Sequence, residues 1–491
     1  MIVKHTKNMK FDLKFSNRFR KMPAALKASA IYTSASFLTK GLQFITIPIF
    51  TRIMSTAEIG IVTTFTSWQT IISVFATLSL NTGAFNVAML EYQDKRDDYE
   101  SSILTLSTLS SSILLLFYLL TSKIWISVLG LSSNLLILML IGFIFTPAMD
   151  YWLARQRYEY EYKKTAVTTL SLAFISTSIS VVAVILASKA GNNDLGTVRI
   201  FTMCSVSIAF ALPFYISIMR HGHIFFSKEY WKYAITINLP LMFHALAKHI
   251  LDVSDRVMIS SMVGESAVGI YGTLYSISSL SLIIWTAINA SLVPYMFEKL
   301  RTQDTEKMNE IVFSLLRVYA VFAFCITLMA PEIVRILATE EYYSAIYMMP
   351  PVAAGIFLTS LYNVFANVLL YYKKTVYIMF ATLGAALINI GLNWWFIPIY
   401  GYIAASYTTL VAYIFLAVFQ YVALRYVHKE TQFPSRHLLL ISITTILLIL
   451  GCNLLYEHAV IRYGVILAIG TFAVIFRKRI LLLVKHVKSK A

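Results

Sequence analysis

Charged residues are scarce in this sequence, and acidic residues are the scarcest. Only 13% of the 491 residues are charged, whereas 58% are hydrophobic and the mean hydropathy is +0.70. Soluble domains carry roughly 25% charged residues, so this composition excludes a soluble enzyme with an ordinary surface. The 24 Asp and Glu residues face 41 Lys and Arg residues. The resulting net charge of +17 fits either nucleic-acid binding or the cytoplasmic side of a membrane.

Cysteines and nucleotide-binding motifs are also nearly absent. Cys204, Cys325 and Cys452 each lie inside an apolar run, which predicts buried free thiols rather than a disulfide framework or a clustered metal site. No G-x-x-x-x-G-K-[ST] phosphate loop occurs, so ATP is not expected as the internal motor. No polar stretch is long enough for a soluble catalytic domain. We therefore predict no enzyme, no metal site and no cofactor, and a coupling ion, H⁺ or Na⁺, stays open.

Long apolar runs make up most of the chain. A helix needs about 20 apolar residues to cross the hydrocarbon core of a bilayer, and fourteen runs approach or reach this length. They lie at 29–51, 60–83, 101–121, 132–153, 165–187, 198–219, 233–254, 267–292, 311–330, 344–371, 375–397, 402–424, 437–455 and 459–476. The fold class predicted is therefore an all-α polytopic membrane protein with fourteen transmembrane helices.

Basic residues are distributed unevenly between alternate loops. If the N-terminus is cytoplasmic, the cytoplasmic segments hold 31 of the 41 Lys and Arg residues and the opposite loops hold seven. This is the positive-inside pattern, and it predicts that both termini are cytoplasmic. The basic arm at 1–28 is also expected to lie on anionic lipid. A membrane thus accounts for the net charge, and we expect no nucleic-acid partner.

The sequence repeats itself at a spacing of 204–210 residues. The matching segments are Arg52-Ile-Met with Arg256-Val-Met, Gly60-Ile61 with Gly269-Ile270, and the YKKT stretches at 162–165 and 372–375. This offset places span 1 on span 7 and span 4 on span 10, which predicts two parallel, pseudo-symmetric six-helix lobes around a central cavity. The predicted divisions are a basic arm at 1–28, an N-lobe at 29–219, a C-lobe at 220–424, two extra helices at 437–476 and a basic tail at 477–491.

Two stretches carry a resemblance to a known family. FITIPIFTRIMSTAEIGIVTT at 44–64 and NLPLMFHALAKHILDVSDRVMISSMVGESAVGIYGTLYSI at 238–277 resemble the polysaccharide-transporter branch of the multidrug/oligosaccharidyl-lipid/polysaccharide (MOP) exporters. These are Wzx-type flippases of bacteria. The likeness extends through the YKKT loops and covers nearly the whole chain.

The resemblance implies a function. It implies a flippase in the bacterial cytoplasmic (inner) membrane that moves an undecaprenyl-pyrophosphate-linked oligosaccharide, such as an O-antigen or capsule repeat unit, to the outer leaflet. It further implies alternating access of a cavity lined by spans 1, 2, 7 and 8. A role in lipopolysaccharide or other polysaccharide biosynthesis would bring a polymerase and a chain-length regulator as partners.

Two other functions remain as alternatives. A cation-coupled multidrug antiporter of the same superfamily would be expected to have twelve spans and carboxylates buried in a lobe. A membrane polysaccharide polymerase or ligase would be expected to carry a large outer loop with catalytic basic residues. The fourteen predicted spans, short outer loops and mostly basic charges within the spans favour the flippase.

Three basic side chains within the spans are the candidate substrate-binding residues. Lys40 lies midway along span 1, and the repeat aligns it with His244 in span 7; Lys248 follows His244 by one helical turn. Charges at membrane depth are expensive and usually face a cavity or a partner, so these groups are predicted to bind the pyrophosphate or an acidic sugar. The alternative is that the lysines extend to the interface or pair with a carboxylate such as Asp252.

A second group of residues is predicted at the outer end. Arg52 and Arg256 occupy equivalent helix ends, and Asp255 precedes the latter. These residues either anchor the helices and form a local pair, or hold a gate closed through ion pairs between the lobes.

Aromatic and amide side chains of spans 2 and 8 are candidate sugar contacts. Aromatic faces stack on sugar rings and amides bind hydroxyls, although Trp and Tyr also gather at membrane interfaces. The candidates are Trp68, Gln69, Asn81, Tyr271, Tyr275 and Asn289.

Overall fold

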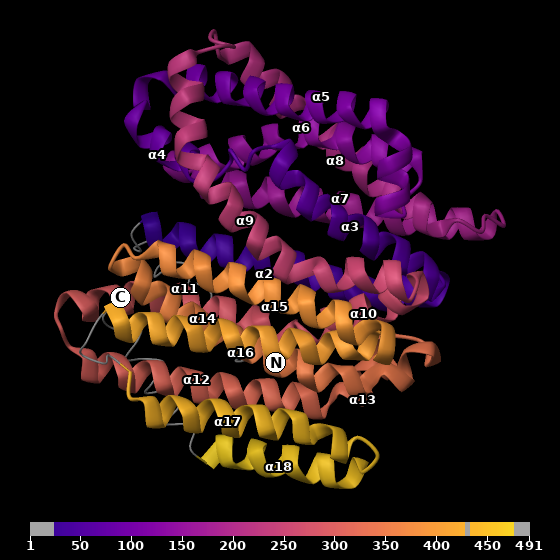
Figure 1. Cartoon of the computed structure of the whole chain (residues 1–491), viewed down its shortest axis with the longest axis vertical. Coiled ribbons are helices and arrows are strands. Elements are labelled where there is room, and N and C mark those ends of the chain that lie inside the picture. Colours follow the sequence, from indigo (N-terminus) through magenta and orange to yellow (C-terminus); the bar gives the residue numbers. More distant parts are fainter. Residues whose placement is uncertain (1–23, 428–432, 476–491) are drawn as a thin grey trace, which may run out of the picture.

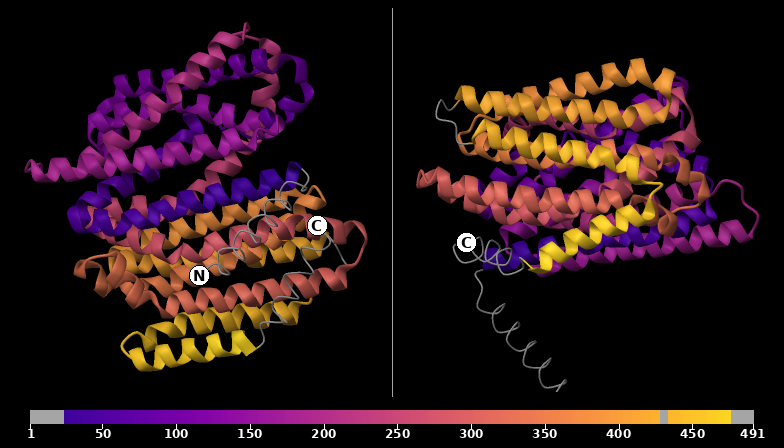
Figure 2. Two further views of the ribbon diagram at one scale, coloured as in Figure 1. Left: turned by 180° about the vertical axis from the view of Figure 1, so that it is seen from behind. Right: turned by 90° about the horizontal axis from the view of Figure 1, so that it is seen from below.

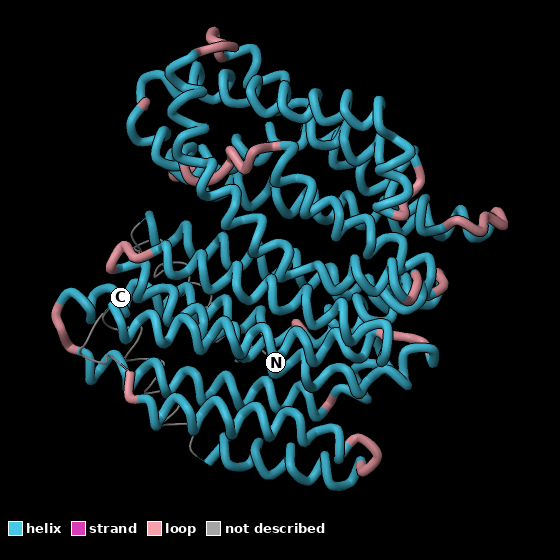
Figure 3. The backbone as a smooth tube through the Cα atoms, in the orientation of Figure 1, coloured by secondary structure: helices cyan, strands magenta, loops and turns pink. Residues whose placement is uncertain are grey.

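The computed structural model describes residues 24–427 and 433–475, and every regular element in these ranges is a helix (Figure 3). The predicted tail at 477–491 lies outside the described residues, as does the predicted arm at 1–28 apart from the first turn of α2. The long helices are α2 (Ala24–Ile53), α3 (Thr56–Ala76), α5 (Arg96–Leu129), α6 (Ser133–Tyr158), α7 (Tyr162–Lys189), α8 (Leu195–His221), α9 (Lys228–Met262), α11 (Leu280–Arg301), α12 (Thr305–Leu328), α14 (Met349–Tyr371), α15 (Thr375–Tyr400) and α16 (Tyr402–Val427). The remaining elements are α4 (Ala84–Glu91), η1 (Gln93–Lys95), α10 (Glu265–Ser278), α13 (Ala330–Leu337), η2 (Glu340–Met348), α17 (Ser435–Gly451), η3 (Cys452–Leu455) and α18 (Ala459–Ile475).

In the part of the chain that the structure describes, each of the fourteen predicted spans lies mostly within helix. Twelve helices in the described part of the chain are long and apolar enough to cross a membrane, so this is a multi-pass membrane protein. The two predicted spans outside that set are the first, which is α2, and the last, which is the shorter α18. Two predicted boundaries also differ. Span 60–83 ends early at Ala76, and span 267–292 is broken into α10 and α11 around Ser279.

The helices form two groups that lie one above the other (Figure 1). The helices α3 and α5 to α8 occupy the upper group, and α10 to α16 the lower one, with α17 and α18 at its far edge (Figure 2). Helix α2 lies between the groups and packs on α7. Helix α9 passes from one group to the other, contacting α5 and α4 with one part and α15 with another.

The start of α3 is fixed by local hydrogen bonds. The N–H of Ser55 donates to Glu58 Oε2 at 2.8 Å, and the N–H of Glu58 donates to Ser55 Oγ at 3.3 Å, which is a capping box. Glu58 Oε1 also accepts a hydrogen bond from the N–H of Leu195 at 2.7 Å. One carboxylate therefore ties the start of α3 to the start of α8.

The chain divides into a first half, α2 to α8, and a second half, α9 to α16, and these halves touch where α3 crosses α10. A Cβ on Gly60 would lie 1.9 Å from the carbonyl oxygen of Glu265, and a Cβ on Gly269 would lie 1.9 Å from that of Thr56. Thr56 and Ser266 share a hydrogen bond of 3.0 Å, and Thr64 donates one of 2.9 Å to the Glu265 carboxylate. Small residues allow helix backbones to approach closely, so these two glycines permit the contact. The glycine pair is the same Gly60/Gly269 pair that marks the sequence repeat.

The chain returns to the end of the bundle where it starts. Helix α2 begins and α18 ends on the same side of the molecule (Figure 1). This arrangement agrees with an even number of crossings. The assignment of that side to the cytoplasm rests on the basic loops and stays a prediction.

Candidate functional site

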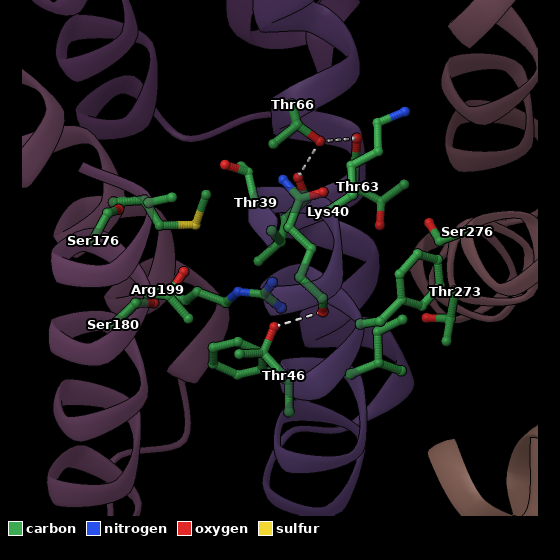
Figure 4. Close-up of a pocket in the computed structure, with 18 of the residues that line it drawn as sticks. Thr39, Lys40, Thr46, Thr63, Thr66, Ser176, Ser180, Arg199, Thr273 and Ser276 are labelled. Carbon is green, nitrogen blue, oxygen red and sulfur yellow. Dashed lines mark hydrogen bonds between the residues drawn. The ribbon is translucent and has the colours of Figure 1, made fainter. Parts of the chain in front are cut away.

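A cavity of about 680 Å³ lies between the two halves, one helical turn inward from the α3–α10 contact. Its walls come from α2, α3, α7 and α8 of the first half and from α10 and the start of α11 of the second (Figure 4). Twenty-one of its twenty-six lining residues belong to the first half. The cavity is therefore mainly a feature of the N-terminal group of helices, closed on one side by the other group.

Hydroxyl groups dominate the cavity wall. Among the described residues that line it, half are Ser or Thr and none is Asp or Glu. Many of these hydroxyls donate to their own helix: Thr46 to the Gln43 carbonyl at 2.8 Å, Thr66 to the Val62 carbonyl at 2.9 Å and Ser276 to the Gly272 carbonyl at 2.7 Å. A hydroxyl has two acceptor lone pairs, so such groups still offer acceptors to a ligand. The hydroxyl-rich part of the wall therefore suits uncharged groups that are rich in hydrogen-bond donors, such as sugars.

The cavity wall carries two charged side chains, Lys40 and Arg199, and both are basic. The structure thus brings the predicted residue Lys40 to the cavity, on α2. Sequence reasoning did not single out Arg199 as a binding residue, although its position as the second residue of the apolar run 198–219 was an available signal. Helix α8 begins earlier, at Leu195, so Arg199 lies within the first turns of the helix and reaches toward α2 (Figure 4).

The other two candidate substrate-binding residues lie elsewhere. Lys248 forms an ion pair of 2.6 Å with Asp252, as the alternative interpretation expected, and it is about half exposed (49%). His244 lies one turn earlier on α9, and its buried Nδ1 has no hydrogen-bond partner among the described residues. Neither residue lines the large cavity. Their role in binding stays a prediction.

The side chains of the predicted gate arginines donate hydrogen bonds mainly to backbone carbonyls. Arg52 donates to the carbonyls of Pro48 at 2.8 Å and Ile336 at 2.9 Å. Arg256 donates to the Asp252 carbonyl at 2.7 Å, and its N–H donates to Asp255 Oδ1 at 2.8 Å. In the part of the chain that the structure describes, neither arginine side chain forms an ion pair with the opposite half. At this end the halves are joined by the α3–α10 crossing and by hydrogen bonds from Thr51 and Arg52 of α2 to the carbonyls of Leu337 and Ile336.

The six predicted sugar contacts are dispersed. Tyr271 is buried and donates to Asp255, while Tyr275 lies under the Arg256 guanidinium, 4.4 Å from it. Asn289 accepts a hydrogen bond from Asn367, and Gln69 lines a separate small cavity within the first half. Trp68 packs partly buried against the core, and Asn81 lies in the turns after α3. None of the six lines the large cavity.

A buried polar network fills the second half at the matching place. Ser254 on α9 donates to Asn389 on α15 at 3.1 Å, and Asn389 donates to Thr409 on α16 at 3.3 Å. Asn393 donates to Asn389 at 3.0 Å, and Thr408 donates to Asn393. Sequence patterning alone did not single out these residues, since isolated Asn and Thr residues in apolar runs are common.

Two families match this chain. The family described as polysaccharide biosynthesis protein matches residues 25–300, and the MatE family matches residues 240–395. An uncharacterized membrane protein of Haemophilus influenzae is 25% identical over 242 residues, which are 47% of this chain and 58% of that protein. The chain therefore spans little more than half the length of this relative.

Solved transporters share the fold. The lipid II flippase MurJ in an inward closed conformation superimposes with a TM-score of 0.66 at 17% identity, over 92% of this chain and 100% of that one. An inward-facing multidrug resistance MATE family transporter of the MOP superfamily gives 0.55 at 13% identity, over 80% and 96%. A MOP superfamily transporter from Pyrococcus furiosus gives 0.54 at 15% identity, over 84% and 98%. At these identities the likeness shows the fold.

Proposed function

The chain belongs to the polysaccharide biosynthesis protein family of the MOP exporter superfamily, and from this membership we propose that it is a flippase for a lipid-linked oligosaccharide. The substrate class is an undecaprenyl-pyrophosphate-linked repeat unit of O-antigen, capsule or another exopolysaccharide. The place of action is the bacterial cytoplasmic membrane. A polymerase and a chain-length regulator of the same pathway are proposed partners, and anionic lipids are proposed to bind the basic cytoplasmic segments.

The composition of the cavity carries this proposal. Its two charged residues, Lys40 and Arg199, are basic, and the rest of the wall is largely hydroxyl and aliphatic. Basic side chains bind phosphate groups through charge-assisted hydrogen bonds, whereas sugar hydroxyls donate to acceptors such as the Ser and Thr oxygens. A ligand that joins a diphosphate to a glycan combines these two chemistries.

The same observation disfavours a multidrug antiporter for cations. A cationic drug needs an acidic or aromatic partner when it leaves water. The lining residues include no carboxylate, and one of their two aromatic rings, that of Phe50, already faces the Arg199 guanidinium. A membrane polymerase or ligase is disfavoured as well. Such an enzyme would be expected to carry a large outer loop, whereas the segment after α12 forms α13 and η2, which pack against α10.

The closed α3–α10 contact fits alternating access. Gly60 and Gly269 hold the halves together at one end of α3 and α10, and Thr63 and Thr273 line the cavity just beyond that contact. Rocking of one half against the other would break this contact and open the cavity to the opposite side.

Gene deletion tests the proposed function. Loss of the flippase should remove the surface glycan and cause the lipid-linked intermediate to accumulate in the inner leaflet. Complementation with the wild-type chain should reverse both effects, while the Lys40→Ala variant at matched expression should not. Normal surface glycan without accumulation, in a strain lacking any second flippase, would contradict the proposal.

A further inference from the structure

Arg199 is an uncompensated charge at the wall of the cavity. Its guanidinium lies over the Phe50 ring, 3.7 Å from the ring centre, and its Nε is buried without a hydrogen-bond partner among residues 24–427 and 433–475. The described ion pairs include none that involves Arg199. An ionisable group inside a membrane protein is costly and is usually paired. The missing counter-charge is therefore expected to come from a ligand.

Among the described residues, the surroundings of Arg199 offer no acidic partner. Tyr342, from η2 of the second half, is close enough to interact electrostatically with the guanidinium, and its buried hydroxyl lies near the Thr273 side chain of the cavity wall. A guanidinium presents five donors in a planar fork that matches phosphate oxygens. The hydroxyl adds a further donor on the opposite half. Together they form a small anion-binding corner where the two halves meet.

The two cations of the cavity lie at different depths. Phe50, which Arg199 contacts, is ten residues beyond Lys40 on α2, and a helix rises 1.5 Å per residue, so the separation along the axis is about 15 Å. Phe50 is close to the end of α2 where the halves touch, whereas Lys40 lies near the middle of the helix. Figure 4 shows both side chains against the same cavity, extending from different helices.

We infer that Arg199 forms a second anion station, which receives the diphosphate of the ligand after Lys40 and holds it beside the α3–α10 contact until the halves separate. This inference rests on the proposed function for the identity of the anion. Binding at this second anion station would draw Arg199 of the first half and Tyr342 of the second half toward one ligand. The two stations divide a long passage across the membrane into shorter steps between compensating charges.

Binding to the purified full chain in detergent tests the station. The probes are farnesyl pyrophosphate, farnesyl monophosphate and farnesol, which share an isoprenoid chain and differ in charge. The wild type should bind the pyrophosphate most tightly. Arg199→Gln should weaken pyrophosphate binding by about tenfold or more, as expected when one charge-assisted contact is lost, and it should leave farnesol binding unchanged. Arg199→Lys keeps the charge but lacks the planar guanidinium, so its affinity for the pyrophosphate should lie between those of the wild type and Arg199→Gln.

Two further variants separate this role from a structural one. Lys189→Gln removes an exposed cation at the end of α7 and should bind all three probes as the wild type does. Lys40→Gln combined with Arg199→Gln should abolish the preference for pyrophosphate over farnesol, which neither single variant should do. The melting temperatures of the ligand-free variants should match that of the wild type if Arg199 acts on the ligand.

The possible failures are distinguishable. If the wild type prefers the pyrophosphate and Arg199→Gln shows the same preference, the proposed station is overturned and the proposed function remains intact. A wild type without any preference for pyrophosphate over farnesol would overturn both. Weakened binding of all three probes by Arg199→Gln and Arg199→Lys alike, with a lower melting temperature, would show that Arg199 only supports the packing of α8 and would also overturn the station.

Discussion

Three helices of the first half line a cavity, whereas the three corresponding helices of the second half pack around buried hydrogen bonds. By the sequence repeat, α2, α7 and α8 of the first half correspond to α9, α15 and α16 of the second. The first set surrounds the cavity with Lys40 and Arg199. The second set is closed by the hydrogen bonds that link Ser254, Asn389 and Thr409. A duplicated scaffold can thus be specialised, with one copy used for a ligand and the other for rigidity.

Equivalent arginines show the same divergence on a small scale. Arg52 and Arg256 each donate to the carbonyl four residues earlier, at 2.8 and 2.7 Å. Arg52 then reaches the Ile336 carbonyl of the opposite half, whereas Arg256 stays over the Tyr275 ring of its own half. The helix ends are alike because the local sequence is alike, and the outer partners differ because the packing differs.

The largest expected effect comes from filling matched positions with a large side chain. The YKKT offset pairs Ser176, which lines the cavity on α7, with Ala386, which is buried on α15. Ser176→Phe should fold normally and abolish glycan export, because its ring has space in the cavity. Ala386→Phe should lower the stability by about 1–3 kcal/mol or prevent folding. Thermal unfolding of the purified variants and an export assay check both, and equal stability of the two variants would contradict the comparison.

A second effect is expected at the crossing of the halves. Gly60→Ala and Gly269→Ala should each destabilise the closed contact by about 1–3 kcal/mol, which shifts the equilibrium between closed and open forms by roughly 5- to 150-fold. A cysteine at Thr273, in the cavity wall, should then react faster with an impermeant maleimide added from the outside. Gly41→Ala is the control, since nothing lies within 4 Å of its added Cβ. Labelling at the control rate in both variants would refute the role of the glycines.

A third expected effect separates the two candidate lysines. Lys40→Gln should reduce export by about tenfold or more, because one charge-assisted contact to the ligand is lost. Lys248→Gln should change export less, since its partner is Asp252 of its own helix and lies outside the cavity. Export rates at matched expression decide the matter. A larger loss for Lys248→Gln would place the binding site in the second half.

The smallest expected effect concerns the start of matched helices. Asp304 caps α12 and pairs with Lys299 at 3.0 Å and Lys307 at 3.1 Å, and these lysines lower the pKa of Asp304 to about 2. Lys95, before the corresponding α5, makes no side-chain cap. The contribution of Asp304 is present above the ordinary Asp pKa, near 4, and is lost as the pH falls toward 2. Asp304→Asn should therefore lower the melting temperature slightly at pH 7 and not at pH 2, whereas a Lys95→Gln control should show no such pH dependence.

The sequence alone determined the spans and the repeat. In lipid each helix must satisfy its own backbone hydrogen bonds, so a run of about 20 apolar residues favours a helix. Most of each predicted run in the described part of the chain is helical, apart from the end of 60–83 and the break at Ser279. The repeat of Gly60 and Gly269 was visible from matching residues in the sequence, and the structure added that each glycine packs against the opposite helix.

Only the tertiary structure decided which polar groups meet. Lys40 and Lys248 have the same chemistry in the sequence, yet one faces the cavity and the other meets Asp252. Arg199 lies within the predicted run 198–219, yet only the tertiary structure places its guanidinium over the Phe50 ring at the cavity wall. The direction in which a side chain points depends on the rotation of its helix and on the neighbours against which the helix packs, and hydropathy carries neither.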